Sequence, residues 1–206
     1  PILVWGDYDV DGISATALIV LYFRTIGYSN MFYHIPNRLT EGYGINSEHI
    51  EILHQKLGSD VLLVSVDCGI SNYDEIAYAK KIGWQVIVTD HHLMPEYSVP
   101  ADAVVNPQQN DCQFPYKSVS GTTVAFYLVA ATRSKLAKHI SLSKSYVSNI
   151  NLKQFLAFVS LGTVADVMPL DQVNRTLVKA GFEAIAGNKI HGISRLLTEL
   201  DINHSS

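Results

Sequence analysis

Three aspartates lie at every second position near the start of the chain. The segment GDYDVDG (6–12) brings Asp7, Asp9 and Asp11 directly after the apolar run ILVW. In an extended segment alternate side chains point to one side, so the three carboxylates would converge there, and Gly12 would let the chain turn into a helix. Carboxylates this close repel one another unless a cation lies between them. Oxygen-rich ligands of this kind suit Mn²⁺ or Mg²⁺.

Two further apolar stretches end in residues of the same kind. Asp67 follows VLLVSV, and the triplet Asp90, His91 and His92 follows VIVT. Ligands of an open parallel sheet bind at the carboxyl ends of its strands, so three strands would bring carboxylates and imidazoles to one edge. Two divalent cations held close together are the usual means of hydrolysing phosphate esters. Taken singly, each Asp has the alternative of a helix cap or turn former, and the two histidines that of an ordinary loop pair.

Strand-like and helix-like patterns alternate over the first half of the chain. Apolar runs of strand length lie at 2–5, 31–36, 61–69, 84–92 and 101–107, and helical patterns lie at 14–27, 46–58 and 72–83. The second of these helices would begin at Asn46 or Ser47, and the third would end at Gly83. The near-continuous apolar strands predict an α/β fold, in which a parallel sheet is flanked by helices on both faces.

The pattern changes from about Ser118. The stretches 122–140, 152–168 and 174–187 have helical rather than strand spacing, and 141–151 is typical of a loop between helices. We therefore expect a parallel α/β catalytic core over residues 1–117 and a mostly helical portion of the same domain over residues 118–206.

Length, charge and cysteine content exclude some classes of protein. The 206 residues suffice for one large core or two modest lobes, and a formal net charge of -4 argues against a surface coated in positive charge for duplex binding. Cys68 and Cys112 are too few for a disulfide framework, which favours the reducing cytoplasm. No apolar stretch reaches transmembrane length. Because the chain opens on a strand-like run without an initiator Met, we expect a fragment trimmed at its start.

Several motifs of this sequence resemble one known family. GDYDVDG, VDCGI, TDHH and GTVADVMPL, in this order and at these spacings, are similar to the DHH phosphoesterases, named for the triplet Asp90-His91-His92. NRLTEGYG (37–44), NPQQNDCQFPYKSVSG (106–121) and Asn174-Arg175 resemble the branch of the family that consists of single-strand-specific 5′-to-3′ DNA exonucleases. The likeness spans essentially the whole chain.

The resemblance implies a centre for two Mn²⁺ or Mg²⁺ ions. Asp9 and Asp11 would each ligate one ion, Asp67 would bridge them, and His91 and Asp166 would complete the second site. Asp166 lies within a helical pattern that is too apolar for an exposed helix, so a buried acid is expected there, and it needs a partner.

Other residues of the motifs would support this chemistry. His92 would face the scissile phosphate, and Asp90 would orient its neighbours. Many members of the family have a metal-ligating histidine where this chain has Trp5. Asp7 is the expected replacement as a ligand, and a core position is the main alternative for Trp5.

Four residues are candidates for substrate binding: Arg38, Ser120, Gly121 and Arg175. Arg38 would grip a phosphate, with an ion pair to Glu41 as the alternative. Ser120 and Gly121 would offer backbone N–H groups at a helix start, where an ordinary cap would look the same. Arg175 would hold a phosphate or dock the last helix, and Tyr8 and Tyr43 would stack on bases.

The function implied is that of a metal-dependent 5′-to-3′ exonuclease, which hydrolyses phosphodiester bonds of single-stranded DNA in repair and recombination. The alternatives are a phosphodiesterase of the same family that acts on short oligonucleotides or cyclic dinucleotides, and a non-catalytic replication scaffold. We expect a cytoplasmic monomer whose partners are single-stranded DNA and a repair helicase or single-strand-binding protein. The DHH-associated domain and OB-fold of such exonucleases are not expected within these residues, which would make the isolated chain a weak nuclease.

Overall fold

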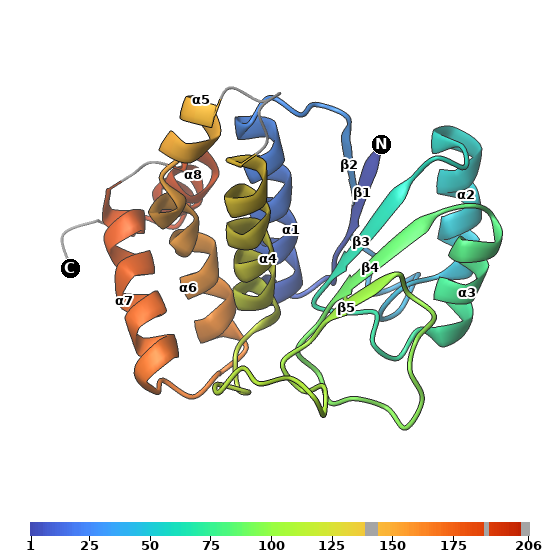
Figure 1. Ribbon diagram of the computed structural model, residues 1–206. Helices are drawn as coiled ribbons and strands as arrows, with labels where there is room; N and C mark the ends of the chain where they lie inside the picture. Colours follow the sequence, from blue (N-terminus) through green and yellow to red (C-terminus); the bar gives the residue numbers. More distant parts are fainter. Residues whose placement is uncertain (139–143, 188–189, 203–206) are drawn as a thin grey trace.

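Five parallel strands form a single sheet in the computed structural model, which describes residues 1–138, 144–187 and 190–202 (Figure 1). The strands are β1 (Ile2–Trp5), β2 (Met31–His34), β3 (Leu62–Val66), β4 (Gln85–Thr89) and β5 (Ala103–Val105). Their order is β2-β1-β3-β4-β5, and all neighbours are parallel, as the sequence predicts. The chain therefore adds β2 on one side of β1 and β3 to β5 on the other, which makes the gap between β1 and β3 a topological switch point. Open α/β sheets bind ligands at the carboxyl ends beside such a switch.

Helices cover both faces of the sheet, because the strands are apolar on both sides. On one face, α1 (Val10–Thr25) and α4 (Gly121–Leu136) pack on the sheet, and α6 (Leu156–Ala165) packs on these two helices. Two helices cover the other face: α2 (Ser47–Leu57) and α3 (Tyr73–Lys81). Alternation along β1 sends Val4 into the core under α1 and α4, and Leu3 and Trp5 into the core under α2 and α3. This confirms the predicted α/β architecture.

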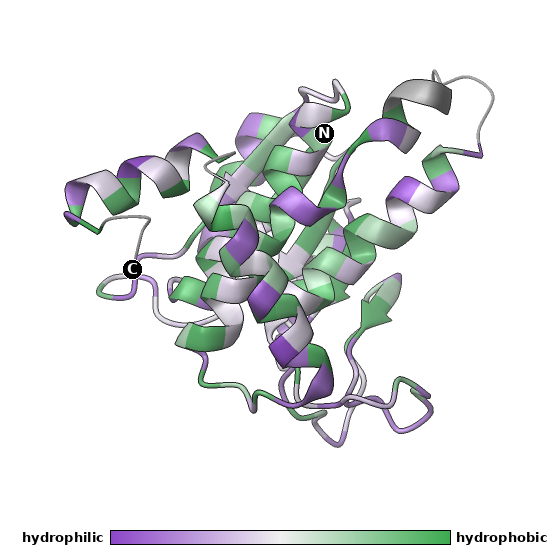
Figure 2. Cartoon of the chain, turned by 90° about the vertical axis from the view of Figure 1, so that its left-hand side faces the viewer, coloured by the Kyte–Doolittle hydropathy of each residue, from purple (hydrophilic) through white to green (hydrophobic). Residues whose placement is uncertain are grey.

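The later part of the chain is mostly helical, as predicted. It adds α5 (Lys144–Asn149), a short 3₁₀ turn (Leu152–Phe155), α7 (Gln172–Ala186) and α8 (His191–Glu199). Polar and apolar residues alternate along the helices of this side, as amphipathic helices with one buried face require (Figure 2). The loop predicted over 141–151 is wrong where α5 forms, and residues 141–143 of that stretch lie outside the described part of the chain.

The predicted start of α2 and the predicted end of α3 agree with the structure. The side chain of Asn46 caps α2 by accepting hydrogen bonds from the N–H groups of Glu48 and His49, and Gly83, at φ 97°, follows the end of α3. Cys68 is buried and Cys112 is half-buried, and both are free thiols. Within the described residues, no helix is long and apolar enough to cross a membrane.

Candidate metal centre

The GDYDVDG segment does not stay extended through its third aspartate. Helix α1 begins at Val10, and Asp9 is its N-cap, whose carboxylate accepts a hydrogen bond of 2.9 Å from the Gly12 N–H. Asp11 therefore lies in the first helical turn rather than on the same side of a strand, which corrects the predicted alternation. Gly12 lies within the helix, where a Cβ would come within 2.6 Å of the Asp7 Cβ. Close packing onto Asp7, and not a turn, is the reason for glycine there.

Asp67 combines a strained backbone conformation with a buried side chain. It follows β3 at φ 61°, a conformation that residues other than glycine rarely adopt. Its Oδ1 lies 3.0 Å from His91 Nε2, yet the contact is not aligned as a hydrogen bond, and this buried oxygen has no hydrogen-bond partner among the described residues. Burial, followed by the nearby charges of Asp11 and Asp9, raises the pKa of Asp67 to about 10.

His91 links carboxylates from different elements. Besides Asp67, its Nε2 lies 3.7 Å from Asp166 Oδ2 and 3.9 Å from Asp11 Oδ2. The apolar pattern predicted that Asp166 lies inside a helix. In the structure it is instead the C-cap of α6, and its side chain is 28% exposed. The following Val167 adopts φ 54° and is exposed, so the apolar pattern does not bury this turn. Burial raises the pKa of Asp166, and its Oδ2 has no hydrogen-bond partner in the described part of the chain.

Asp11 is held by the first turn of α4. Its two oxygens accept hydrogen bonds from the N–H groups of Gly121 at 2.6 Å and Thr122 at 2.9 Å, and from the Thr122 hydroxyl at 2.6 Å. Ser120 caps the helix through the N–H of Thr123. The Gly121 amide is therefore engaged by Asp11, and Ser120 is the ordinary helix cap that was the alternative interpretation, while a phosphate contact of these two residues stays a prediction.

Asp90 positions the two histidines that follow it. Its Oδ1 accepts hydrogen bonds from the N–H groups of His91 at 2.7 Å and His92 at 3.1 Å and contacts His92 Nδ1 at 2.7 Å, while its Oδ2 accepts from the Ile70 N–H. Burial works to raise the pKa of Asp90, but the His92 and Ile70 hydrogen bonds outweigh it and lower the pKa. The hydrogen bond between Asp90 Oδ1 and His92 Nδ1 raises the pKa of His92, whose side chain is half exposed.

A row of aromatic rings leads away from His92. The ring of Tyr43 lies edge-on to His92 at 6.2 Å and to Tyr8 at 6.5 Å, and the Arg38 guanidinium lies over the Tyr8 ring at 5.4 Å. The alternative ion pair of Arg38 with Glu41 is absent from the described residues. Arg38 is exposed and is joined through these edge-on rings to the histidine beside the acids.

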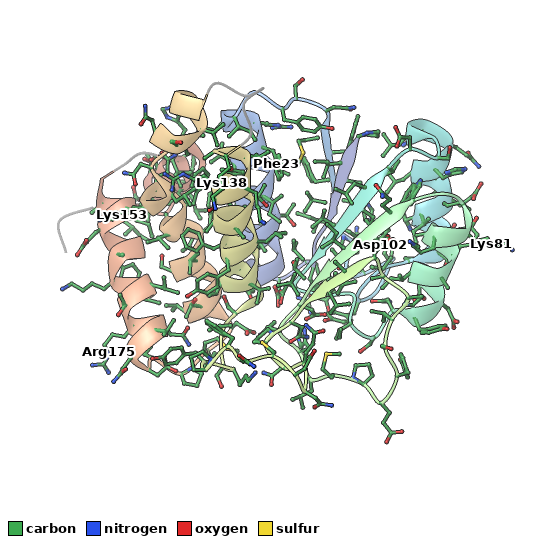
Figure 3. All side chains as sticks on the ribbon, viewed as in Figure 1. Phe23, Lys81, Asp102, Lys138, Lys153 and Arg175 are labelled. Carbon is green, nitrogen blue, oxygen red and sulfur yellow. The ribbon has the colours of Figure 1, made fainter. Side chains whose placement is uncertain are left out.

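Arg175 has no hydrogen bond or ion pair with the acids among the described residues. It is exposed in the first turn of α7, on the side of that helix that faces away from the sheet (Figure 3). The neighbouring Asn174 instead docks the helix, because its buried side chain donates to the backbone oxygens of Ser118 at 2.7 Å and Pro169 at 2.8 Å.

The family follows from comparison with known sequences. Residues 1–162 match the family described as DHH family, N-terminal domain. The chain belongs to the DHH family. It is 44% identical over 197 residues to the single-stranded-DNA-specific exonuclease RecJ of Escherichia coli (strain K12), an alignment that covers 95% of this chain and 34% of that protein. The chain thus spans about a third of the length of this curated relative.

Solved structures of the same kind superpose on the DHH chain. A crystal structure of exonuclease RecJ bound to manganese matches with a TM-score of 0.80 and 33% identity, over 99% of this chain and 48% of that one. The structure of RecJ in complex with Mn²⁺ from Thermus thermophilus matches with a TM-score of 0.76 and 30% identity, over 98% of this chain and 27% of that one.

The acids of this DHH chain form sets that fit divalent cations. We call the following residues the acid centre: Asp7, Asp9, Asp11, Asp67, His91 and Asp166. Ligand atoms of Asp7, Asp9 and Asp67 lie within 4.8 Å of one another, as do those of Asp11, His91 and Asp166. Two buried carboxylate oxygens lack a hydrogen-bond partner among the described residues, and an oxygen-rich set with one imidazole is the chemistry of Mn²⁺ and Mg²⁺ sites.

Sequence reasoning missed two residues that support this centre. Thr122 fixes Asp11, and Asn106 donates from Nδ2 to the backbone oxygen of His92 at 2.9 Å. Both lie in NPQQNDCQFPYKSVSG or directly after it, so the motif itself was the available signal. Trp5, by contrast, is wholly buried in the core under α2 and α3, as the alternative interpretation predicted.

Proposed function

We propose that this chain is the DHH catalytic unit of a metal-dependent 5′-to-3′ exonuclease, which hydrolyses phosphodiester bonds of single-stranded DNA in repair and recombination. The observation that carries the proposal is the convergence of carboxylates at one edge of the sheet, two of them with a buried oxygen that lacks a hydrogen-bond partner among the described residues, beside an exposed imidazole and the Arg38–Tyr8–Tyr43 row. The Escherichia coli relative, a single-stranded-DNA-specific exonuclease, supports it. In this proposal residues 1–117 are the catalytic core and residues 118–206 are the helical portion of the same DHH domain.

The two sets of ligand atoms suggest how two Mn²⁺ or Mg²⁺ ions are shared. Asp7, Asp9 and Asp67 would hold one ion, and Asp11, His91 and Asp166 would hold the other. Asp67 also lies within reach of His91, which makes it the residue between the two sets. The two manganese-bound RecJ structures support this choice of ion. When bound, such ions neutralise charge on the phosphate and lower the pKa of a bound water.

The protein's own groups would bind and orient the strand. Asp90 holds His92 Nδ1, so Nε2 is the ring atom left to donate a proton to a phosphate oxygen or to the leaving group. Because the pKa of His92 is raised, more of this ring is protonated near neutral pH. Arg38 would grip a phosphate, and the Tyr8 and Tyr43 rings would stack on bases, which is tolerant of sequence and selective for unpaired strands.

A panel of 5′-labelled substrates tests the proposal. Single strands, duplexes, dinucleotides and cyclic dinucleotides are incubated with Mn²⁺, with Asp67→Ala as the inactive control. We expect nucleotides to be released from the 5′ end of single strands alone. Preference for dinucleotides or cyclic dinucleotides would assign the chain to the short-substrate phosphodiesterases of the family. Metal binding without hydrolysis of any of these would favour a scaffold.

The setting of the enzyme follows from its substrate. A single-strand-specific exonuclease needs an unpaired 5′ end, which a repair helicase or single-strand-binding protein would supply. We propose such a partner, with the enzyme acting as a monomer in the cytoplasm. Analytical ultracentrifugation of the chain with and without a labelled single strand tests the stoichiometry, and a dimer in either case would contradict it.

A further inference from the structure

Three ligand-type side chains meet at the carboxyl end of β2, outside the acid centre. His34 is the last residue of β2, Glu41 lies in the loop 37–44, and His49 lies in the first turns of α2. One ligand atom from each lies within 4.8 Å of the other two. We call these three residues the β2 cluster. Side chains from a strand, a loop and a helix converge here although seven and eight positions separate them in the sequence.

One carboxylate oxygen serves both imidazoles. Glu41 Oε2 lies 2.7 Å from His34 Nε2 and 3.4 Å from His49 Nε2, while Oε1 accepts a hydrogen bond from the Asn37 N–H. The contact with His49 is not aligned as a hydrogen bond, and within the described residues His49 Nδ1 is buried without any partner. His49 is therefore an imidazole whose nitrogen faces a carboxylate but makes no hydrogen bond with it.

The positions of these groups are fixed by their surroundings. The His34 ring packs on the buried Trp5 ring at 4.4 Å and faces the His49 ring at 5.1 Å. Trp5 is itself held by its Nε1–H, which donates to the Gly44 oxygen. The aromatic residue at the end of β1 thus orients a histidine of the neighbouring strand, and ligands that are oriented in advance bind a metal with less loss of entropy.

The protonation states suit metal ligands. Burial lowers the pKa of His34, which keeps this ring neutral at neutral pH. For Glu41, burial works to raise the pKa, but hydrogen bonds from the Asn37 N–H and from His34 outweigh it, so its carboxylate stays ionised. A cation entering here would meet ligands that have few protons to displace.

We propose that His34, Glu41 and His49 form a third metal site, separate from the acid centre, that binds Zn²⁺ or a similar borderline transition-metal ion. Two imidazoles and one carboxylate form a ligand set that zinc uses in proteins, with water in the fourth position. Bonds of about 2.0–2.1 Å place the ligands of a tetrahedral ion about 3.4 Å apart. The His49–Glu41 separation is already 3.4 Å, and the His34–Glu41 pair would need to open slightly from 2.7 Å.

An ion at this site would brace the loop 37–44. Glu41 holds that loop through the Asn37 N–H, and Arg38 and Tyr43 belong to the same loop. If Arg38 and Tyr43 bind single-stranded DNA, a consequence that rests on the proposed function, zinc would reduce the entropy lost when the strand binds. The metal site itself requires no assumption about the substrate.

The proposal is tested by measuring the number of Zn²⁺ ions bound per chain and the absorption of Co²⁺ bound in their place. The full chain is loaded with Zn²⁺, dialysed and analysed for metal per chain, and a parallel sample is titrated with Co²⁺ and followed by visible absorption. We expect His49→Ala and Glu41→Gln each to bind one Zn²⁺ fewer than the wild type and to lose one Co²⁺ absorption component. His54→Ala is the matched control, because His54 is on the same helix but outside the β2 cluster.

Circular dichroism establishes that each variant is folded before metal is counted. Equal zinc content in the wild type, His49→Ala and Glu41→Gln would overturn the proposal. The Asp67→Ala variant separates this result from the nuclease, because its Co²⁺ component at the β2 cluster should persist when hydrolysis is lost. If that component disappears with Asp67→Ala, the ion belongs to the acid centre and the third site is refuted, whatever the substrate panel shows.

Discussion

Two groups of ligand-type side chains lie at the carboxyl end of the same sheet and differ in how their carboxylates are satisfied. In the acid centre, Asp67 Oδ1 and Asp166 Oδ2 are buried without hydrogen-bond partners in the part of the chain that the structure describes, and the pKa of Asp67 is raised to about 10. In the β2 cluster, both oxygens of Glu41 have partners, and the pKa of Glu41 is lowered. The same kind of side chain at the same edge is thus in opposite electrostatic states.

The difference shows which of the two groups requires a cation for its charge to be offset. A buried carboxylate without a partner destabilises the fold when it ionises, so the acid centre requires a cation to offset its charge. The β2 cluster is satisfied by its own hydrogen bonds and stabilises the loop 37–44 even without an ion. Replacing a carboxyl by an amide should therefore have opposite effects on stability in the two places.

The largest effect is expected from Asp67→Asn in the metal-free protein. An unfolded Asp has a pKa of about 3.9, so between this pH and about 10 the native state holds one more proton at Asp67 than the unfolded state does. The free energy of unfolding should fall as pH rises through this window, by at most about 1.4 kcal/mol per pH unit. Asn has no such proton, and Asp67→Asn should raise the free energy of unfolding by about 2–4 kcal/mol at pH 7.

Urea unfolding in EDTA over a series of pH values measures this. The wild-type slope should be reduced in Asp67→Asn without vanishing, because Asp7 and Asp166 also have raised pKa values. Saturating Mn²⁺ should flatten the slope of the wild type more than that of the variant, which keeps the ligand set of Asp11, His91 and Asp166. A wild-type protein that gains stability with rising pH in EDTA would contradict the assignment of Asp67 as an uncompensated acid.

The second prediction concerns Asp90, a buried acid beside the centre whose oxygens are both hydrogen-bonded. Asp90→Asn keeps the shape but removes the negative charge that holds the His92 ring and replaces one of the two accepting oxygens by an NH2 donor, so kcat should fall by about 10- to 100-fold. The pH profile of the rate should also shift to lower pH, because the raised pKa of His92 depends on Asp90. Steady-state kinetics on a labelled single strand measure both, with the exposed Asp74→Asn as control. An unchanged pH profile would show that Asp90 serves the fold alone.

Much of this edge could be predicted from the sequence, because strands buried on both faces are continuous apolar runs and polar residues mark their ends. The strands before Asp67 and Asp90 were predictable for that reason. The start of α1 was not, because Asp9 caps a helix with the same carboxylate that suits a metal ligand. The role of Asp9 as a ligand, like those of the other acids, stays a prediction.

Long-range hydrogen bonds and clusters without regular spacing were not predictable. Thr122 meets Asp11 across 111 positions, and no periodic pattern connects the two. His34, Glu41 and His49 match no motif spacing, so only the fold brings them together. The short helix α5 lies in a serine-rich stretch whose local preference favours turns.

In the β2 cluster we expect a substitution to lower the free energy of unfolding, whereas Asp67→Asn should raise it. Glu41→Gln, without added metal, removes a charged acceptor from His34 and the Asn37 N–H, so the free energy of unfolding should fall by about 1–2 kcal/mol. Urea unfolding at pH 7 in EDTA measures the change, and Glu48→Gln, at an exposed position in the first turn of α2, is the matched control. A gain in stability, as in Asp67→Asn, would mean that Glu41 is also an uncompensated charge, and the contrast between the two groups would fail.

The smallest effect is expected from Arg38→Lys. This substitution tests whether the loop 37–44 binds the same substrate as the acid centre. Lysine keeps the charge but loses the planar guanidinium that lies over the Tyr8 ring, a contact worth about 0.5–1 kcal/mol at an exposed site. The KM for single-stranded DNA should therefore rise roughly 2- to 5-fold with little change in kcat. Arg175→Lys, in the first turn of α7 on the side away from the sheet, should leave both constants unchanged. If Arg175→Lys raises KM as much as Arg38→Lys, the strand also crosses α7, and the row from Arg38 to His92 is not its only path.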